Sequence, residues 1–224
     1  MKRLLTCVIG LLAFTTSSCA LASLLTVTPK DLIGQTVSCP TDETAKAEGF
    51  KVLSTQTWSQ GVIVLYSARC PINAGKSMMR PMFGHKVVKR TGTTWQVSGG
   101  SSYGTENESV PSEQLVEYGI SRSSNQHRMS GSSQPEELPY TILYGRVLKP
   151  KVVAVEATFD NGKTMRDESS NGVFALLSAG ATGICELRLL GADNQMLRQE
   201  DLAVPKHLAQ TGQTTQCLPV SHQL

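Results

Sequence analysis

Residues 144–198 read YGRVLKPKVVAVEATFDNGKTMRDESSNGVFALLSAGATGICELRLLGADNQMLR. The stretch consists of short apolar runs, and turn-forming residues separate most of them. β-branched residues are frequent in these runs and turn signals recur at short intervals, a pattern that favours strands over helices. We therefore expect an antiparallel β module of about six strands.

The turn signals predict where the chain reverses. Asn161 and Gly162 stand between two apolar runs. An Asn-Gly pair can supply the two positive-φ residues of a type I′ turn, so it predicts a tight hairpin. Asn-Gly at 171–172 and Asp-Asn at 193–194 predict two further turns.

Alternation within the runs predicts which side chains face the core. In residues 184–190, Cys185, Leu187 and Leu189 occupy alternate positions, with charged residues between them. Because successive side chains of a strand point to opposite faces, these three are expected to face the core. Residues 152–159 are largely apolar on both faces, which predicts a central strand covered on both sides, as in a sandwich.

The chain begins with the three parts of a signal peptide: Lys2 and Arg3, an apolar run over residues 4–14, and the small residues TTSSCALAS. The apolar run is too short to span a membrane, which takes about 20 residues. We therefore expect the protein to be exported.

Two cleavage sites compete. Cleavage after the A-x-A sequence removes a signal peptide of residues 1–22 and leaves Ser23 as the first mature residue. Alternatively, residues 1–18 form a lipoprotein signal, and Cys19 is lipidated and becomes the first residue. The first cut predicts a secreted protein, and the second predicts anchoring to a membrane through the lipid on Cys19.

Charge argues against a nucleic-acid partner. The full chain has a formal charge of +3. Loss of Lys2 and Arg3 lowers this to +1, because residues 1–22 contain no acid. A chain so close to neutral gives no electrostatic case for binding nucleic acid.

Four cysteines remain after the leader: Cys39, Cys70, Cys185 and Cys217. An even number in an exported chain suggests disulfides, although four cysteines permit three pairings. We favour Cys39–Cys70 and Cys185–Cys217. In the chain-entropy model, each of these disulfides would stabilise the fold by about 3–4 kcal/mol, because it closes a loop in the unfolded chain. The alternatives are free thiols or a zinc site, but no metal-ligand spacing supports zinc.

Residues 24–98 predict a smaller β-rich N-terminal part. Thr28-Pro29 resembles the start of a helix, and Gly34 is expected to end that helix early. Residues 42–47 suggest a further turn or two of helix. Two hairpins are expected after it. The first pairs residues 52–57 with 62–69, and the second pairs 84–90 with 93–98.

The composition changes after residue 98. Residues 99–137 are rich in Gly, Ser and Asn, which predicts a long connection interrupted by one edge strand at 114–121. A loop of this length inside one compact domain is unusual and favours a domain boundary. Residues 138–224 would then form the C-terminal β module, and the Cys185–Cys217 disulfide would attach the tail to it.

Four segments carry a resemblance: WQVSGGSS, YGRVL, VVAVEATFDNGKT and NGVFALL. Over about half of its length, the chain resembles uncharacterised exported bacterial proteins and lipoproteins with an immunoglobulin-like C-terminal β module. The resemblance implies an antiparallel sandwich and a setting in the cell envelope. It carries over no catalytic or binding residue.

Local motifs for catalysis, phosphate or metal are incomplete. Gly75-Lys76-Ser77 resembles the end of a P-loop, but Cys70 stands where that motif needs glycine. The acids at 167–168 offer calcium-type oxygens without the glycine and further acids of a calcium loop. We therefore assign no catalytic, cofactor-binding or metal-binding residue.

Two further sets of residues carry charge or could bind a metal. The first is a modest basic cluster, which predicts a solvated face or a patch for anionic lipid or an acidic polymer: Lys76, Arg80, His85, Lys86, Lys89 and Arg90. The second comprises the histidines, which lack metal spacing and are expected at the surface in loops and tail: His85, His127, His207 and His222.

The expected function is that of a non-enzymatic extracytoplasmic accessory or binding protein of the cell envelope, in the periplasm or at the cell surface. Its expected partner is an envelope macromolecule contacted through loops. The alternative is a hydrolase or an enzyme subunit whose site is not visible as a motif.

The leader makes a direct prediction. The mature protein is expected to start at Cys19, carrying lipid, or at Ser23. Intact-mass spectrometry of the native protein separates the two cuts. A mature species that keeps Met1 would contradict both.

Overall fold

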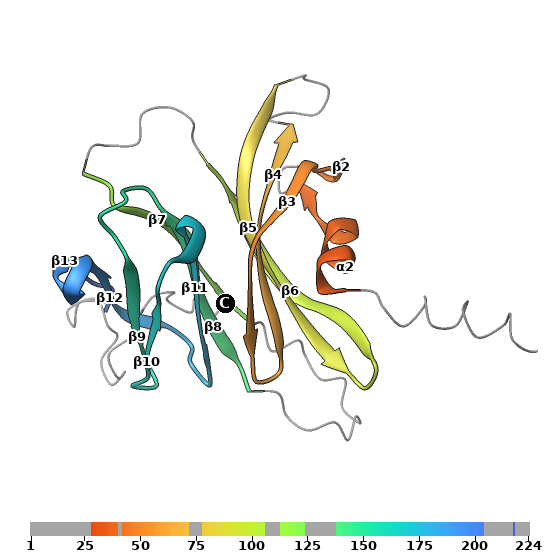
Figure 1. Ribbon diagram of the computed structural model, residues 1–224. Coiled ribbons are helices and arrows are strands. Elements are labelled where there is room, and N and C mark those ends of the chain that lie inside the picture. The colour runs from red at the N-terminus through yellow and green to blue at the C-terminus, as the bar shows by residue number, and fades with distance from the viewer. Residues whose placement is uncertain are drawn as a thin grey trace, which may run out of the picture.

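The computed structural model describes residues 28–39, 42–71, 78–105, 113–123, 138–203 and 217. Three antiparallel sheets stack face to face, and one short helix covers the outside of the first sheet (Figure 1). The expected mainly-β, antiparallel fold is confirmed. None of the helices in these ranges is both long and apolar enough to span a bilayer.

The described chain opens with helix α2 (Pro29–Thr36). Thr28 is its N-cap: the Thr28 hydroxyl accepts from the Asp31 amide at 3.3 Å, and the Asp31 carboxylate accepts from the Thr28 amide in return. This capping box and Pro29 satisfy the first turn, so the predicted start is confirmed. The helix does not end at Gly34 but continues to Thr36, because Ile33 is fully buried against the sheet.

Strand β1 (Ser38–Cys39) pairs with β2 (Asp42–Lys46) in a small ladder beside this helix. The helical turn predicted over 42–47 is therefore wrong. The disulfide between Cys39 and Cys70 fixes the ladder to the neighbouring sheet, with the two Cα atoms 5.6 Å apart. Tertiary pairing here overrides a weak local preference for helix.

The first large sheet has the order β3-β4-β5-β6. Its strands are β3 (Glu48–Trp58), β4 (Gly61–Pro71), β5 (Met79–Thr91) and β6 (Thr94–Gly104). Both predicted hairpins are confirmed, since β3 pairs with β4 and β5 pairs with β6.

The C-terminal strands form two further sheets, with orders β11-β8-β7 and β10-β9-β12-β13. Their bounds are β7 (Val116–Arg122), β8 (Tyr140–Val147), β9 (Ala154–Phe159), β10 (Thr164–Asp167), β11 (Val173–Ala179), β12 (Ile184–Leu190) and β13 (Met196–Asp201). The predicted edge strand at 114–121 is confirmed as β7.

The strand order of the C-terminal sheets differs from that of a constant-type immunoglobulin domain in the position of one strand. Lettered A to G in chain order, β7 to β13 give A-B-E in one sheet and D-C-F-G in the other. The constant-type immunoglobulin order is ABED with CFG, so the fourth strand here pairs with C instead of E. The sandwich is observed, and the immunoglobulin-like assignment stays a prediction.

The middle sheet is covered on both faces. On β8, Ile142 and Tyr144 pack against β4 and β5 of the first sheet. Leu143, between them in sequence, packs against β9 and β12 of the third sheet. The two predicted parts of the chain, 24–98 and 138–224, are thus joined through a shared hydrophobic layer.

Two expectations about buried faces are wrong. Residues 152–159 were expected to be covered on both sides, but Glu156 and Thr158 on β9 are only half-buried, and the doubly covered strand is β8. Cys185 was expected in the core. A β-bulge between Ile184 and Glu186 puts Ile184 there instead and leaves Cys185 half-buried, where it bonds Cys217.

The Gly- and Ser-rich start of the predicted connection is part of strand β6. A side chain at Gly100 would bring a Cβ to 2.5 Å from the His85 carbonyl oxygen, so only glycine fits beside β5. Tyr103 packs its ring against Phe83 and Tyr144, at centroid distances of 5.6 and 5.7 Å. Small residues here let aromatic rings approach a neighbouring strand.

Both favoured disulfides are present, Cys39–Cys70 and Cys185–Cys217. Cys217 also forms a single antiparallel bridge with Ala203, just beyond β13. The tail is therefore stapled to the third sheet at this residue. Two disulfides indicate an oxidising, extracytoplasmic setting.

The β9–β10 hairpin differs from the predicted type I′ turn. Gly162 has a φ of +78°, but Asn161 has no positive φ. The Gly162 amide donates to the Phe159 carbonyl, as in a type I turn followed by a glycine bulge. Positive φ at both central residues is found instead at Asp193 and Asn194.

Gly162→Val should lower the free energy of unfolding by about 1–3 kcal/mol, because a β-branched residue is strained at positive φ. A Cβ at this position meets no atom within 4 Å, so the loss measures backbone strain alone. Gly162→Asn, which tolerates positive φ better, is the control and should lose less. Equal denaturant midpoints for all three proteins would contradict the turn geometry.

Candidate binding surface

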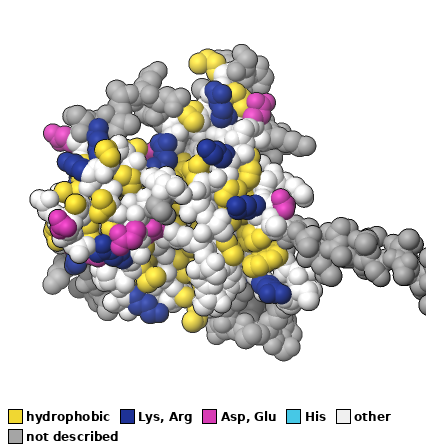
Figure 2. Space-filling view, viewed as in Figure 1, with side chains coloured by type: hydrophobic (Ala, Val, Ile, Leu, Met, Phe, Trp, Pro, Cys, Tyr) yellow, Lys and Arg dark blue, Asp and Glu magenta, His cyan; other side chains and the backbone are white. Residues whose placement is uncertain are grey.

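The predicted basic cluster is divided between the two faces of β5. Alternation places Arg80, Lys86 and Arg90 on the outer face of the first sheet, and His85 and Lys89 on the face that meets β8. Across the face drawn in Figure 2, Lys and Arg side chains are scattered. The cluster is therefore not one patch.

His85 is not at the surface, where it was expected, but 1% exposed between the first and middle sheets. Its ring lies 4.2 Å from that of Tyr144, and Nε2 is 3.0 Å from the Ser121 hydroxyl on β7. Burial, with a smaller contribution from Lys86, lowers the pKa of His85 to about 3. The imidazole is thus neutral at physiological pH.

The Ser121–His85 contact resembles a nucleophile and its base. In such a pair a third group normally orients the imidazole through Nδ1. Here Nδ1 is buried and has no hydrogen-bond partner among the described residues. The contact instead links β5 to β7 across the two sheets, which is a structural role.

On one side of the stack, polar contacts join three edge strands. The Tyr103 hydroxyl on β6 donates to the Glu117 carbonyl on β7 at 3.3 Å. The Tyr118 hydroxyl on β7 donates to the Glu200 carboxylate on β13 at 3.0 Å. Burial and the Glu200 charge raise the pKa of Tyr118 to about 12, so this hydroxyl stays protonated.

A groove opens beside the Tyr118–Glu200 contact, between β7 and β13. It consists of two adjoining hollows of about 540 and 340 Å³, which share Leu115 and Arg198 in their walls. Val116, Pro150, Leu189 and Leu197 add apolar surface to its lining. We call this feature the edge groove, because it follows two strands that end their sheets.

The larger hollow of the edge groove has charged residues of both signs in its walls. Lys149 and Lys151, which flank Pro150 in the turn between β8 and β9, line it together with Glu113. Arg198 is neutralised by Glu200, at 2.9 Å. Within the described ranges no ion pair engages either lysine, so this end is the more cationic.

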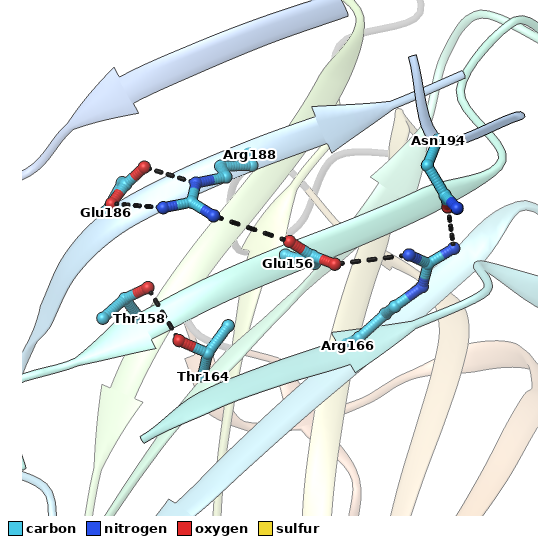
Figure 3. A network of polar contacts seen from close by, with 7 residues as sticks. All are labelled: Glu156, Thr158, Thr164, Arg166, Glu186, Arg188 and Asn194. Atoms are coloured by element: carbon cyan, nitrogen blue, oxygen red, sulfur yellow. Dashed lines mark hydrogen bonds and ion pairs between the residues drawn. The ribbon is translucent and has the colours of Figure 1, made fainter. Parts of the chain in front are cut away.

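The outer face of the third sheet carries a ladder of alternating charge (Figure 3). Glu156 on β9 lies between Arg166 on β10, at 3.3 Å, and Arg188 on β12, at 3.9 Å. Arg188 also pairs with Glu186, and Arg166 donates to the Asn194 side chain at 2.8 Å. These charges compensate one another, so this face offers a charged partner little net attraction.

The acid at 167, considered for calcium, has a structural role. The Asp167 carboxylate on β10 accepts from the Ala175 amide on β11 at 2.8 Å and from the Ser169 amide at 2.9 Å. It also accepts from the Gln56 side chain on β3. One carboxylate thus joins all three sheets on the side of the stack away from the edge groove.

Several residues singled out from the sequence lie outside the described residues: Cys19, Ser23, Lys76, His127, His207 and His222. In the part of the chain that the structure describes, no group of three or more His, Cys, Asp or Glu side chains is placed to hold a metal ion.

Comparisons of this chain with models of protein families, with curated proteins and with solved structures found no match.

Sequence reasoning missed the edge groove, because its walls come from three distant segments. A local signal was present: Lys149-Pro150-Lys151 places two cations at a turn between apolar runs. Only pairing of β7 with β8 and of β12 with β13 brings Leu115 and Leu197 beside that turn.

Burial of neutral His85 makes stability depend on pH. As pH falls below about 6.5, the unfolded chain binds this proton first, because the folded-state pKa is near 3. Between these values the wild type should lose up to about 1.4 kcal/mol per pH unit more than His85→Gln.

The measurement is denaturant unfolding of both proteins across this pH range. His85→Gln is the matched variant because its amide can still bond Ser121. The other titrating groups are common to both proteins and cancel in the difference. Parallel stability curves would contradict the burial of a neutral imidazole.

Proposed function

We propose that this chain is a non-enzymatic extracytoplasmic accessory or binding protein of the cell envelope, and that the edge groove is its binding site. The observation that carries the proposal is the groove itself, in which an apolar lining meets two lysines without ion-pair partners in the described ranges. Binding sites commonly combine an apolar lining with a few orienting polar groups.

The surroundings of the edge groove support this proposal. The groove is built on the ends of strands, and two disulfides brace the fold. A rigid frame lowers the entropy cost of binding. The disulfides and the leader sequence together favour export, to the periplasm or to the cell surface with lipid on Cys19. Membership of the exported immunoglobulin-like group is part of the same proposal.

The alternative is a hydrolase or an enzyme subunit. Its specific support is the 3.0 Å contact between Ser121 and His85. Against it stands the burial of His85, which is 1% exposed and so out of reach of a substrate.

A photo-crosslinking side chain at Lys151, in intact cells, tests the binding site. Lys163, an exposed residue of the β9–β10 hairpin, is the matched control position. We expect one dominant crosslinked envelope partner from position 151 and none from 163. Equal crosslinking from both positions, or hydrolase turnover that Ser121→Ala abolishes, would overturn the proposal.

A further inference from the structure

We propose that the edge groove binds an anionic lipid of the envelope, with one acyl chain lying along the groove and the head group beside Lys149 and Lys151. This inference rests on the proposed function and names the ligand class of the same site. It follows from three features of the groove: its size, the place of its apolar surface and the uneven distribution of its charges.

The two hollows form one elongated site of the size that small ligands occupy. The larger measures about 540 Å³ and the smaller about 340 Å³, and Leu115 and Arg198 belong to the walls of both. Ligand pockets in proteins commonly measure about 300–1,000 Å³. A single flexible chain suits this shape, because it can pass from one hollow to the next along their shared wall.

Apolar side chains lie along the length of the groove. Pro150 and Leu197 line the larger hollow beside the lysines, Val116 and Leu189 line the smaller one, and Leu115 connects the two. Pro150 is exposed and Leu197 is half-buried, so both keep apolar surface in contact with water. An alkyl chain that covers this surface removes it from water, which favours binding.

Charge distinguishes the two hollows. The walls of the larger one hold three cations and one acid: Lys149, Lys151, Arg198 and Glu113. The walls of the smaller one hold one cation and two acids: Arg198, Glu113 and Glu200. An anionic head group is therefore attracted to the larger hollow and repelled by the smaller one, which fixes the direction of the chain.

Ion pairs within the groove sharpen this difference. Arg198 pairs with Glu200 at 2.9 Å, and Glu200 also accepts from the Tyr118 hydroxyl at 3.0 Å. These groups are therefore already occupied by one another. In the part of the chain that the structure describes, no ion pair engages Lys149 or Lys151. Their two ammonium groups are the donors left to bind a head group.

Calorimetric titration of the mature full chain with three amphiphiles of equal chain length tests the head group. The probes are decyl phosphate, decyltrimethylammonium and decyl maltoside, each below its critical micelle concentration. We expect decyl phosphate to bind at least about tenfold more tightly than the cationic and neutral probes. Equal affinity for all three would overturn the proposal.

A series of hexyl, octyl and decyl phosphate tests the chain. Affinity should rise roughly two- to fourfold for each added methylene, because the chain leaves water for the groove. Inorganic phosphate, which has no chain, should bind far more weakly than decyl phosphate. Equal affinity of inorganic and decyl phosphate would show that the apolar lining is not used, and would contradict the proposal.

Matched variants locate the binding site. Lys149→Glu with Lys151→Glu should abolish the preference for phosphate. Lys163→Glu should keep it, since the β9–β10 hairpin lies at the edge of the third sheet opposite β13. Leu197→Ser should weaken the dependence on chain length, whereas Met165→Ser, at an exposed position of β10, should not. The reverse pattern in either pair would place the ligand elsewhere and overturn the proposal.

Photolabelling locates the end of the chain. Decyl phosphate that carries a diazirine at its far end should label residues 114–118, which line the smaller hollow. Labelling confined to β10, or to the outer face of the third sheet, would contradict the assigned direction and site.

Two outcomes separate this inference from the proposed function. If position 151 crosslinks an envelope protein in cells while no alkyl phosphate binds, the binding site stands and the lipid assignment fails. If position 151 crosslinks no partner and no alkyl phosphate binds, the proposed function and the lipid assignment both fail.

Discussion

The fold depends on strand β8, which is buried on both faces. Ile142 and Leu143 are neighbours in sequence and both are 0% exposed, one against the first sheet and the other against the third. Truncation of either to alanine is expected to cost about 2–5 kcal/mol. Because one strand serves two cores, the N-terminal sheet and the C-terminal sandwich share a layer. Polar contacts then close the two sides of the stack, through Asp167 on one and Tyr118 on the other.

Alternating apolar residues and turn-forming residues predicted most of the strands, because both patterns act over short distances along the chain. The hairpins and β7 followed from these patterns, whereas the two disulfides followed from the even number of cysteines in an exported chain. What failed depended on distant partners. Residues 152–159 are apolar on both faces and so were predicted to be the strand covered on both sides, but the strand buried on both faces is β8. His85 looked exposed because its neighbours on β8 lie far along the chain. The glycines of β6 looked like a linker because the packing of Tyr103 and Tyr144 is invisible in composition.

The same limit applies to the candidate site. The edge groove joins the start of β7, the turn at Lys149-Pro150-Lys151 and the start of β13. No motif spans these segments, so a search for catalytic or metal signatures could not find it. The result is a scaffold braced by two disulfides, with the charges on the outer face of the third sheet paired to one another. The edge strands β7 and β13 lie on one side of the stack, next to the groove and its two lysines.

The central claim is that the three sheets unfold as one unit through β8, and the positions of the tryptophans allow a direct test. The chain has two, Trp58 on β3 and Trp95 on β6, so fluorescence reports the first sheet while circular dichroism reports all strands. Leu143→Ala removes packing only on the side of β8 away from the first sheet. Denaturant unfolding of this variant should shift the fluorescence and dichroism midpoints together and by the same amount. A shifted dichroism transition with an unmoved tryptophan transition would show two independent units and contradict the account.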